Sequence, residues 1–171
     1  LSVFDWPRDG KLYLPGLTKE IVTARLLNGS RSQKISFEQK QGWTIFQVPF
    51  RPADTPASVI ELTFQSSLQP ADVEPTPGLA PNTETRLLAV FAEVNGAERK
   101  AVNWMEKFGE WKHVTQISKW GEGSWAGWTI NVLEPGYYYV ELCYKGKERL
   151  VWNISTDEGE VVQNQKAATE K

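Results

Sequence analysis

Short runs in which apolar and polar residues alternate fill the first 65 positions of the chain. The run 58–64 sets Ile60, Leu62 and Phe64 on one face, and the run 42–48 alternates in the same way. Asp-Gly and Asn-Gly pairs mark turns between such runs. A period of two residues with turns roughly every ten positions is typical of an antiparallel β-sandwich.

A proline-rich stretch follows, from residue 66 to residue 83. It contains Pro70, Pro75, Pro77 and Pro81. Proline lacks the backbone N–H that a ladder needs and fixes φ, so this stretch is predicted to be neither a central strand nor a helix. We expect an extended, semi-rigid linker between two folded units.

A second β-rich stretch begins at residue 84. Strand-like runs are predicted at 87–94, 112–119, 125–133, 137–144 and 150–154. The run 103–108 fits either a short helix or a bulged strand, and the polar tail 162–171 is interpreted as a frayed or cut end. Cys143 is expected to be a small buried hydrophobic residue of its strand. The predicted fold is all-β, with two consecutive antiparallel β-sandwich units, 1–65 and 84–171, joined by the Pro-rich linker 66–83.

Composition excludes several classes of function. The net charge is -2 and like charges do not cluster, so the sequence has no basic patch of the kind that binds nucleic acid. No apolar run approaches the roughly 18 residues of a membrane span. A chain of 171 residues is too short for a (β/α)₈ barrel of about 250 residues. One cysteine and one histidine cannot supply a zinc site, and we expect no cofactor. The chain opens on Leu1 inside a strand-like run, which we interpret as a cut edge of a longer polypeptide.

A motif near the N-terminus indicates a class of protein to which the chain is similar. Residues 3–17 read VFDWPRDGKLYLPGL, which joins a Trp-Pro strand end, a polar turn and a Leu-x-Leu-Pro strand. With the runs 24–27, 42–48 and 53–62 following in the same order, residues 1–64 resemble the C-terminal β-sandwich of the α-L-fucosidase glycoside hydrolase family. The resemblance implies a periplasmic or extracellular bacterial enzyme whose catalytic barrel lies N-terminal to this region. The family's nucleophile and acid/base carboxylates belong to that barrel and match no position here, so we assign no catalytic residue and expect no enzyme activity from this chain alone.

The second unit resembles the jelly-roll modules appended to many bacterial glycosidases. Residues 125–132 read WAGWTINV, and residues 134–142 read EPGYYYVEL. In such modules a hairpin of this kind joins two aromatic strands. The resemblance implies a carbohydrate-binding role for the stretch 84–171.

Exposed aromatic side chains are the candidate sugar-binding groups, because a flat indole or phenol matches the apolar face of a pyranose ring. Trp120 and Trp125 flank the loop 121–124, and Tyr137 and Tyr139 share one face of their predicted strand. The alternatives are packing at a sheet edge for the two tryptophans and packing against the first sandwich or the barrel for the two tyrosines. Trp128 and Trp152 share faces with aliphatic residues and are expected in the core.

The carboxylates have two other candidate roles. Glycosidases need a facing carboxylate pair, and Asp5, Glu61 and Glu141 are each expected on a solvated strand face instead. A weak calcium candidate comprises Asp157, Glu158 and Glu160, for which a solvated turn is the alternative.

Three functions remain open from the sequence. The first is a non-catalytic accessory region that braces the catalytic barrel of its parent enzyme and holds glycan near it. The second is an autonomous, lectin-like carbohydrate-binding module, and the third is a purely structural surface sandwich. The expected partners are therefore the barrel and glycans, with neither nucleic acid nor membrane among them.

Overall fold

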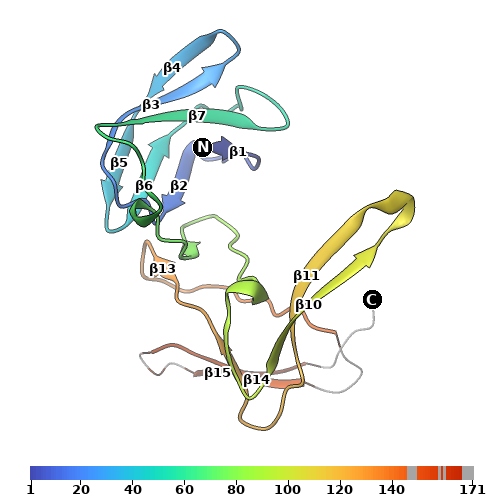
Figure 1. Ribbon diagram of the computed structural model, residues 1–171. Helices are drawn as coiled ribbons and strands as arrows, with labels where there is room; N and C mark the ends of the chain where they lie inside the picture. The colour runs from blue at the N-terminus through green and yellow to red at the C-terminus, as the bar shows by residue number, and fades with distance from the viewer. Residues whose placement is uncertain (146–149, 158, 160, 167–171) are drawn as a thin grey trace. The chain divides into compact units, whose positions relative to one another are not determined.

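The computed structural model spans Leu1–Lys171 and describes residues 1–145, 150–157, 159 and 161–166. Within this described part, every regular element is a β-strand or one turn of 3₁₀ helix, and no helix is long and apolar enough to cross a membrane. The chain divides into two units, Leu1–Pro135 and Gly136–Lys171 (Figure 1). The prediction of an all-β chain is confirmed.

Two antiparallel sheets form the N-terminal part of the first unit. One has the strand order β1-β7-β3-β4, and the other has the order β2-β6-β5. The strands are β1 (Ser2–Val3), β2 (Lys11–Pro15), β3 (Ile21–Asn28), β4 (Arg31–Ile35), β5 (Phe37–Lys40), β6 (Trp43–Gln47) and β7 (Ser58–Phe64). The bounds of β7 are those that the alternation predicts.

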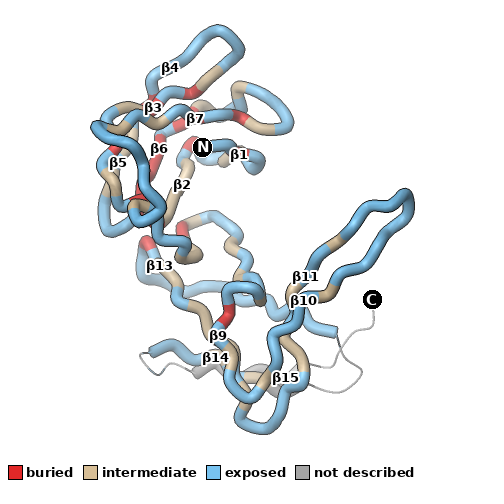
Figure 2. The backbone as a smooth tube through the Cα atoms, viewed as in Figure 1, coloured by how far each residue is buried: buried red, intermediate tan, exposed pale blue. Residues whose placement is uncertain are grey.

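These two sheets share one apolar core. Strands β3 and β7 supply Ala24, Leu26 and Ile60, and β6 supplies Phe46; all four side chains are buried. Figure 2 colours buried positions along these strands red. Phe37 packs against Phe46 with ring centroids 6.0 Å apart. Burying an aliphatic or aromatic side chain contributes about 1.5–3 kcal/mol, so this cluster is the principal stabilising element of the N-terminal strands.

Local contacts fix the turn between β1 and β2. The Lys11 amide donates a hydrogen bond to Asp9 Oδ1 at 3.1 Å, and Gly10 has a φ of 75°, where glycine is favoured over other residues. The predicted Asp-Gly turn is therefore confirmed. The predicted strand end at Trp6-Pro7 is wrong, because β1 already ends at Val3. Trp6 Nε1 donates to the Pro49 carbonyl at 2.7 Å, which joins the segment between β1 and β2 to the segment after β6.

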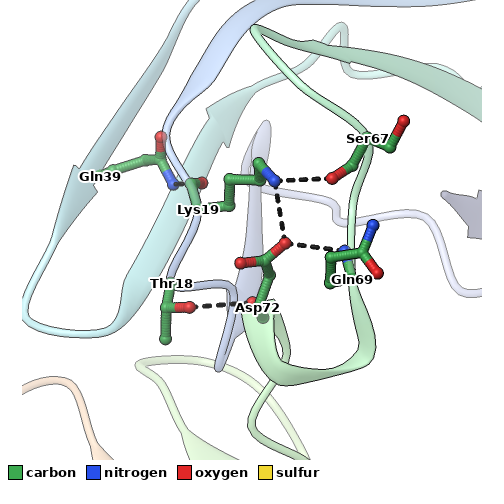
Figure 3. A network of polar contacts seen from close by, with 6 residues as sticks. All are labelled: Thr18, Lys19, Gln39, Ser67, Gln69 and Asp72. Carbon is green, nitrogen blue, oxygen red and sulfur yellow. Dashed lines mark hydrogen bonds and ion pairs between the residues drawn. The ribbon is translucent and has the colours of Figure 1, made fainter.

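The proline-rich segment contacts the loop between β2 and β3 through a polar network (Figure 3). Asp72 ends a turn of 3₁₀ helix, η1 (Pro70–Asp72), and its Oδ2 accepts a hydrogen bond from the Gln69 amide at 2.7 Å. The same oxygen pairs with Lys19 Nζ at 3.0 Å, and the Thr18 hydroxyl donates to the Asp72 carbonyl at 3.0 Å. The Gln69 amide and then the Lys19 ammonium hold the pKa of Asp72 below its usual value.

Close backbone contacts also hold the proline-rich segment against the end of β2. Gly16 has a φ of 77°, and a Cβ at this position would lie 2.0 Å from the Glu74 carbonyl oxygen, so only glycine fits. Beyond η1 the segment forms one short strand, β8 (Gly78–Leu79). The prediction that the prolines exclude a central strand and a long helix is confirmed, whereas the division into two sandwich units at residues 66–83 stays a prediction.

A second, smaller core lies where β8 meets the first sheets. Buried Trp43 packs with Ala80 and Leu133, and its Nε1 donates to Asn131 Oδ1 at 2.8 Å. Strand β13 (Asn131–Val132) pairs with β8 in parallel. Residues near 80 and near 132 are thus docked on the outer side of β6.

The remainder of the first unit departs from several predictions. Its elements are η2 (Ala89–Phe91), β9 (Glu93–Asn95), β10 (Glu98–Met105), η3 (Lys107–Gly109), β11 (Trp111–Ser118) and β12 (Trp125–Gly127). The strand at 112–119 is confirmed as β11, and the ambiguous run 103–108 is the end of β10 followed by η3. The long strand predicted at 87–94 is wrong, because only Glu93 and Val94 of this run belong to a strand, β9. The single long strand predicted at 125–133 is wrong as well, because this run is divided between two short strands, β12 and β13.

Within the second unit, β14 (Leu150–Ser155) pairs antiparallel with β15 (Val161–Lys166). The strand predicted at 150–154 is confirmed, and β15 occupies residues that were interpreted as a polar tail. The strand predicted at 137–144 is wrong, since these residues form no ladder in the described part of the chain. Aromatic and β-branched residues favour a strand only where a neighbouring strand supplies partners. For the same reason Cys143 is exposed rather than buried.

Candidate functional site

The loop between β11 and β12 is shaped by one serine. Ser124 Oγ donates to the Gly96 carbonyl at 2.6 Å and accepts from the Gly121 amide at 2.8 Å. At the start of this loop Lys119 has a φ of 55° and pairs with Glu98. Their contact lowers the pKa of the Glu98 carboxyl and raises the pKa of the Lys119 amine, through the hydrogen bond first and the opposite charges second.

The two candidate tryptophans lie at either end of this loop. Trp120 is 54% exposed, and its Nε1 donates to the Ile117 carbonyl at 3.1 Å. Trp125 is 49% exposed, and its ring lies over Gly127, where a Cβ would come within 3.3 Å of the indole. Each indole is therefore held by one local contact while about half of its surface is exposed to solvent, and an exposed indole can stack on a ligand.

The two candidate tyrosines belong to the second unit. Tyr137 and Tyr139 are both fully exposed and lie outside any strand. They therefore do not share a strand face as the alternation predicted. Trp120 and Trp125 belong to the first unit.

The expected core tryptophans are only partly buried. Trp128 is half-buried, and its Nε1 donates to the Leu88 carbonyl at 3.0 Å. Trp152 on β14 is half-buried as well. The indole of Trp128 thus joins the segment before η2 to the segment after β12.

The remaining candidates are carboxylates. Asp5, Glu61 and Glu141 are exposed, as expected for solvated positions. Of the calcium candidates, Asp157 is exposed, while Glu158 and Glu160 lie outside the described residues. Among the residues that the structure describes, no group of three or more His, Cys, Asp or Glu side chains is arranged to hold a metal ion.

The sequence did not indicate that the β10–β11 hairpin carries a group of exposed side chains on one face. Its register places Met105 opposite Trp111 and Asn103 opposite His113. His113 Nδ1 lies 2.8 Å from Asn103 Oδ1, and all four residues are exposed. The alternation on either side of residues 106–110 was a signal of this hairpin, but only the register shows which residues share a face.

Comparison with protein-family models, with curated proteins and with solved structures found no match for this chain.

Proposed function

We propose that this chain is a non-catalytic accessory region of a secreted α-L-fucosidase-like glycoside hydrolase, which braces the catalytic barrel and holds glycan near it. The observation that carries the proposal is the Trp-Pro…Leu-x-Leu-Pro motif of residues 3–17. Its second half forms strand β2, and Trp6, Leu12 and Leu14 pack against the first core. The finer organisation, two sandwich units joined by a Pro-rich linker, and the periplasmic or extracellular location are parts of the same proposal.

An apolar groove supports the bracing role. It has a volume of about 520 Å³ and is lined mainly by side chains of β7 and its neighbours, among them Leu1, Leu27, Val59 and Leu68. Val59 and Leu68 remain exposed. Exposed apolar surface of this kind marks an interaction site in many proteins. We propose that the catalytic barrel of the parent enzyme packs on this groove.

Turnover of a nitrophenyl α-L-fucoside tests the non-catalytic claim. The purified 171-residue chain should release no nitrophenol above the rate of a buffer control. Measurable turnover that a single carboxylate variant, such as Glu61→Gln, abolishes would overturn the proposal, because the reactive groups would then lie in this chain.

The half-exposed indoles of Trp120 and Trp125 favour a second candidate, an autonomous carbohydrate-binding module. A glycan array probed with the whole chain separates the two functions. Binding that Trp120→Ala and Trp125→Ala both remove would favour the module. Absence of binding to any sugar would favour a structural brace.

A further inference from the structure

The β10–β11 hairpin is a two-stranded ribbon that is attached at one end (Figure 1). Near its base, Arg99 Nη1 donates to the carbonyls of Val90 and Ala92, at 3.1 and 2.9 Å. Towards the tip, Met105 and Trp111 are each 59% exposed. An isolated hairpin is marginally stable in water, so contacts at the base, the two arginine hydrogen bonds among them, help to orient this ribbon.

One face of the ribbon combines an aromatic and a polar part. Residues directly opposite in an antiparallel ladder share a face, and so do residues two apart along a strand. The pairs Met105–Trp111 and Asn103–His113 are neighbours by this rule and lie on the same face. Trp104 lies on the opposite face, where its ladder partner is Lys112.

The polar pair is positioned beside the indole with hydrogen-bonding capacity to spare. The contact between His113 Nδ1 and Asn103 Oδ1 uses one ring nitrogen and the amide oxygen. The Asn103 amide nitrogen and the His113 Nε2 remain as further hydrogen-bonding groups. Because the two side chains hold one another, less entropy is lost when a ligand uses them.

We propose that this face binds a pyranose ring, stacked on Trp111 and hydrogen-bonded through its hydroxyls to Asn103 and His113. This inference rests on the glycan-holding part of the proposed function and assigns it to a surface that the sequence did not indicate. A purely apolar protein partner would bury the polar pair without replacing its bonds to water, which is costly. A sugar offers a flat C–H face and hydroxyls at its edge, so it satisfies both parts of the surface.

Titration of the whole chain with methyl α-L-fucoside, and with methyl β-D-galactoside as a second sugar, tests the inference. The readout is the shift of the backbone amide signals of β10 and β11 in a proton–nitrogen correlation spectrum, which every variant retains. Trp111→Ala should weaken binding about tenfold, which corresponds to the loss of roughly 1.4 kcal/mol of stacking. Trp111→Phe should retain most of the affinity because it keeps a flat ring, and Asn103→Leu should weaken binding by a smaller factor.

Trp104→Ala is the matched control, because it removes an indole from the other face of the same hairpin. It should leave the affinity within about twofold, and the spectra of both alanine variants should otherwise overlay on that of the unchanged protein. Binding that survives Trp111→Ala but is lost in Trp120→Ala would overturn this inference and leave the proposed function standing. Absence of binding to both sugars would overturn the inference and the glycan-holding role, while the fucoside turnover assay would still decide the non-catalytic claim separately.

Discussion

Replacing Gly78 with alanine would place a methyl group inside the contact between β8 and the Trp43 indole. A Cβ on residue 78 would lie 2.2 Å from Trp43 Cη2, 2.8 Å from Cζ2 and 2.9 Å from Pro15 Cβ. Carbon atoms prefer separations of about 3.5–4.0 Å, so the indole has to move by roughly 1 Å or more. Trp43 is buried, and its Nε1 is bonded to Asn131 at 2.8 Å, so this movement also breaks that bond.

The size of the effect follows from these two terms. Overpacking of a tight core costs about 1–3 kcal/mol, and loss of the Trp43–Asn131 hydrogen bond costs about 1 kcal/mol more. We therefore expect Gly78→Ala to lower the free energy of unfolding by about 2–4 kcal/mol. With a urea slope of about 2 kcal/mol per molar, the midpoint should fall by roughly 1–2 M. Gly136→Ala is the matched control, since a Cβ there meets nothing within 4 Å, and it should change stability by less than about 0.5 kcal/mol.

A double-mutant cycle with Trp43→Phe identifies the cause. The smaller ring leaves room for the new methyl group, so the double variant should be more stable than the sum of the two single losses predicts, by at least about 1 kcal/mol. Unfolding is followed by near-ultraviolet circular dichroism. Additive losses, or a Gly78→Ala variant as stable as the unchanged protein, would refute the packing of β8 on Trp43.

Three further predictions address the first core, the Lys19–Asp72 contact and the loop between β11 and β12. Ile60→Ala should cost about 2–5 kcal/mol because Ile60 is fully buried, whereas Val59→Ala on the same strand should cost less than about 1 kcal/mol; urea unfolding measures both. The pKa of Asp72 is lowered in the folded state, so the ionised carboxylate stabilises the fold. The stability difference between the unchanged protein and Asp72→Asn should therefore be present above pH ~4 and should vanish as the pH falls through the folded pKa. A difference that persists in acid would contradict this prediction. Ser124→Ala removes the bond to the Gly96 carbonyl and should speed hydrogen exchange of the loop amides by about five- to tenfold; unchanged exchange would show that the loop is held by other contacts.

The alternation of side chains predicts the elements whose two faces differ. Strand β7 has the predicted bounds because Ile60 faces the core and its neighbour Val59 does not. The Asp9-Gly10 turn was equally predictable, since its chemistry is local. Prolines correctly exclude long regular structure from residues 66–83, but they contain no sign of the Lys19–Asp72 contact, which joins residues 53 positions apart.

The aromatic strands were harder to predict, because an aromatic run forms a strand only where a neighbouring strand pairs with it. The run 137–144 has strand-forming residues but no ladder partner in the described part of the chain. Trp120 and Trp125 were predictable as exposed because glycines surround them, and their exposure is confirmed. The Trp111 face was not predictable, since single-sequence alternation does not fix the register that sets Asn103 opposite His113.

The most direct test of the proposed function assays this chain apart from the catalytic barrel that we propose precedes it. The coding sequence upstream of Leu1 and the 171-residue chain are expressed apart, and turnover of a nitrophenyl α-L-fucoside is measured for each. We predict that a barrel encoded upstream carries all of the turnover and that this chain carries none. Turnover by this chain, or an upstream sequence that encodes no barrel, would contradict the claim.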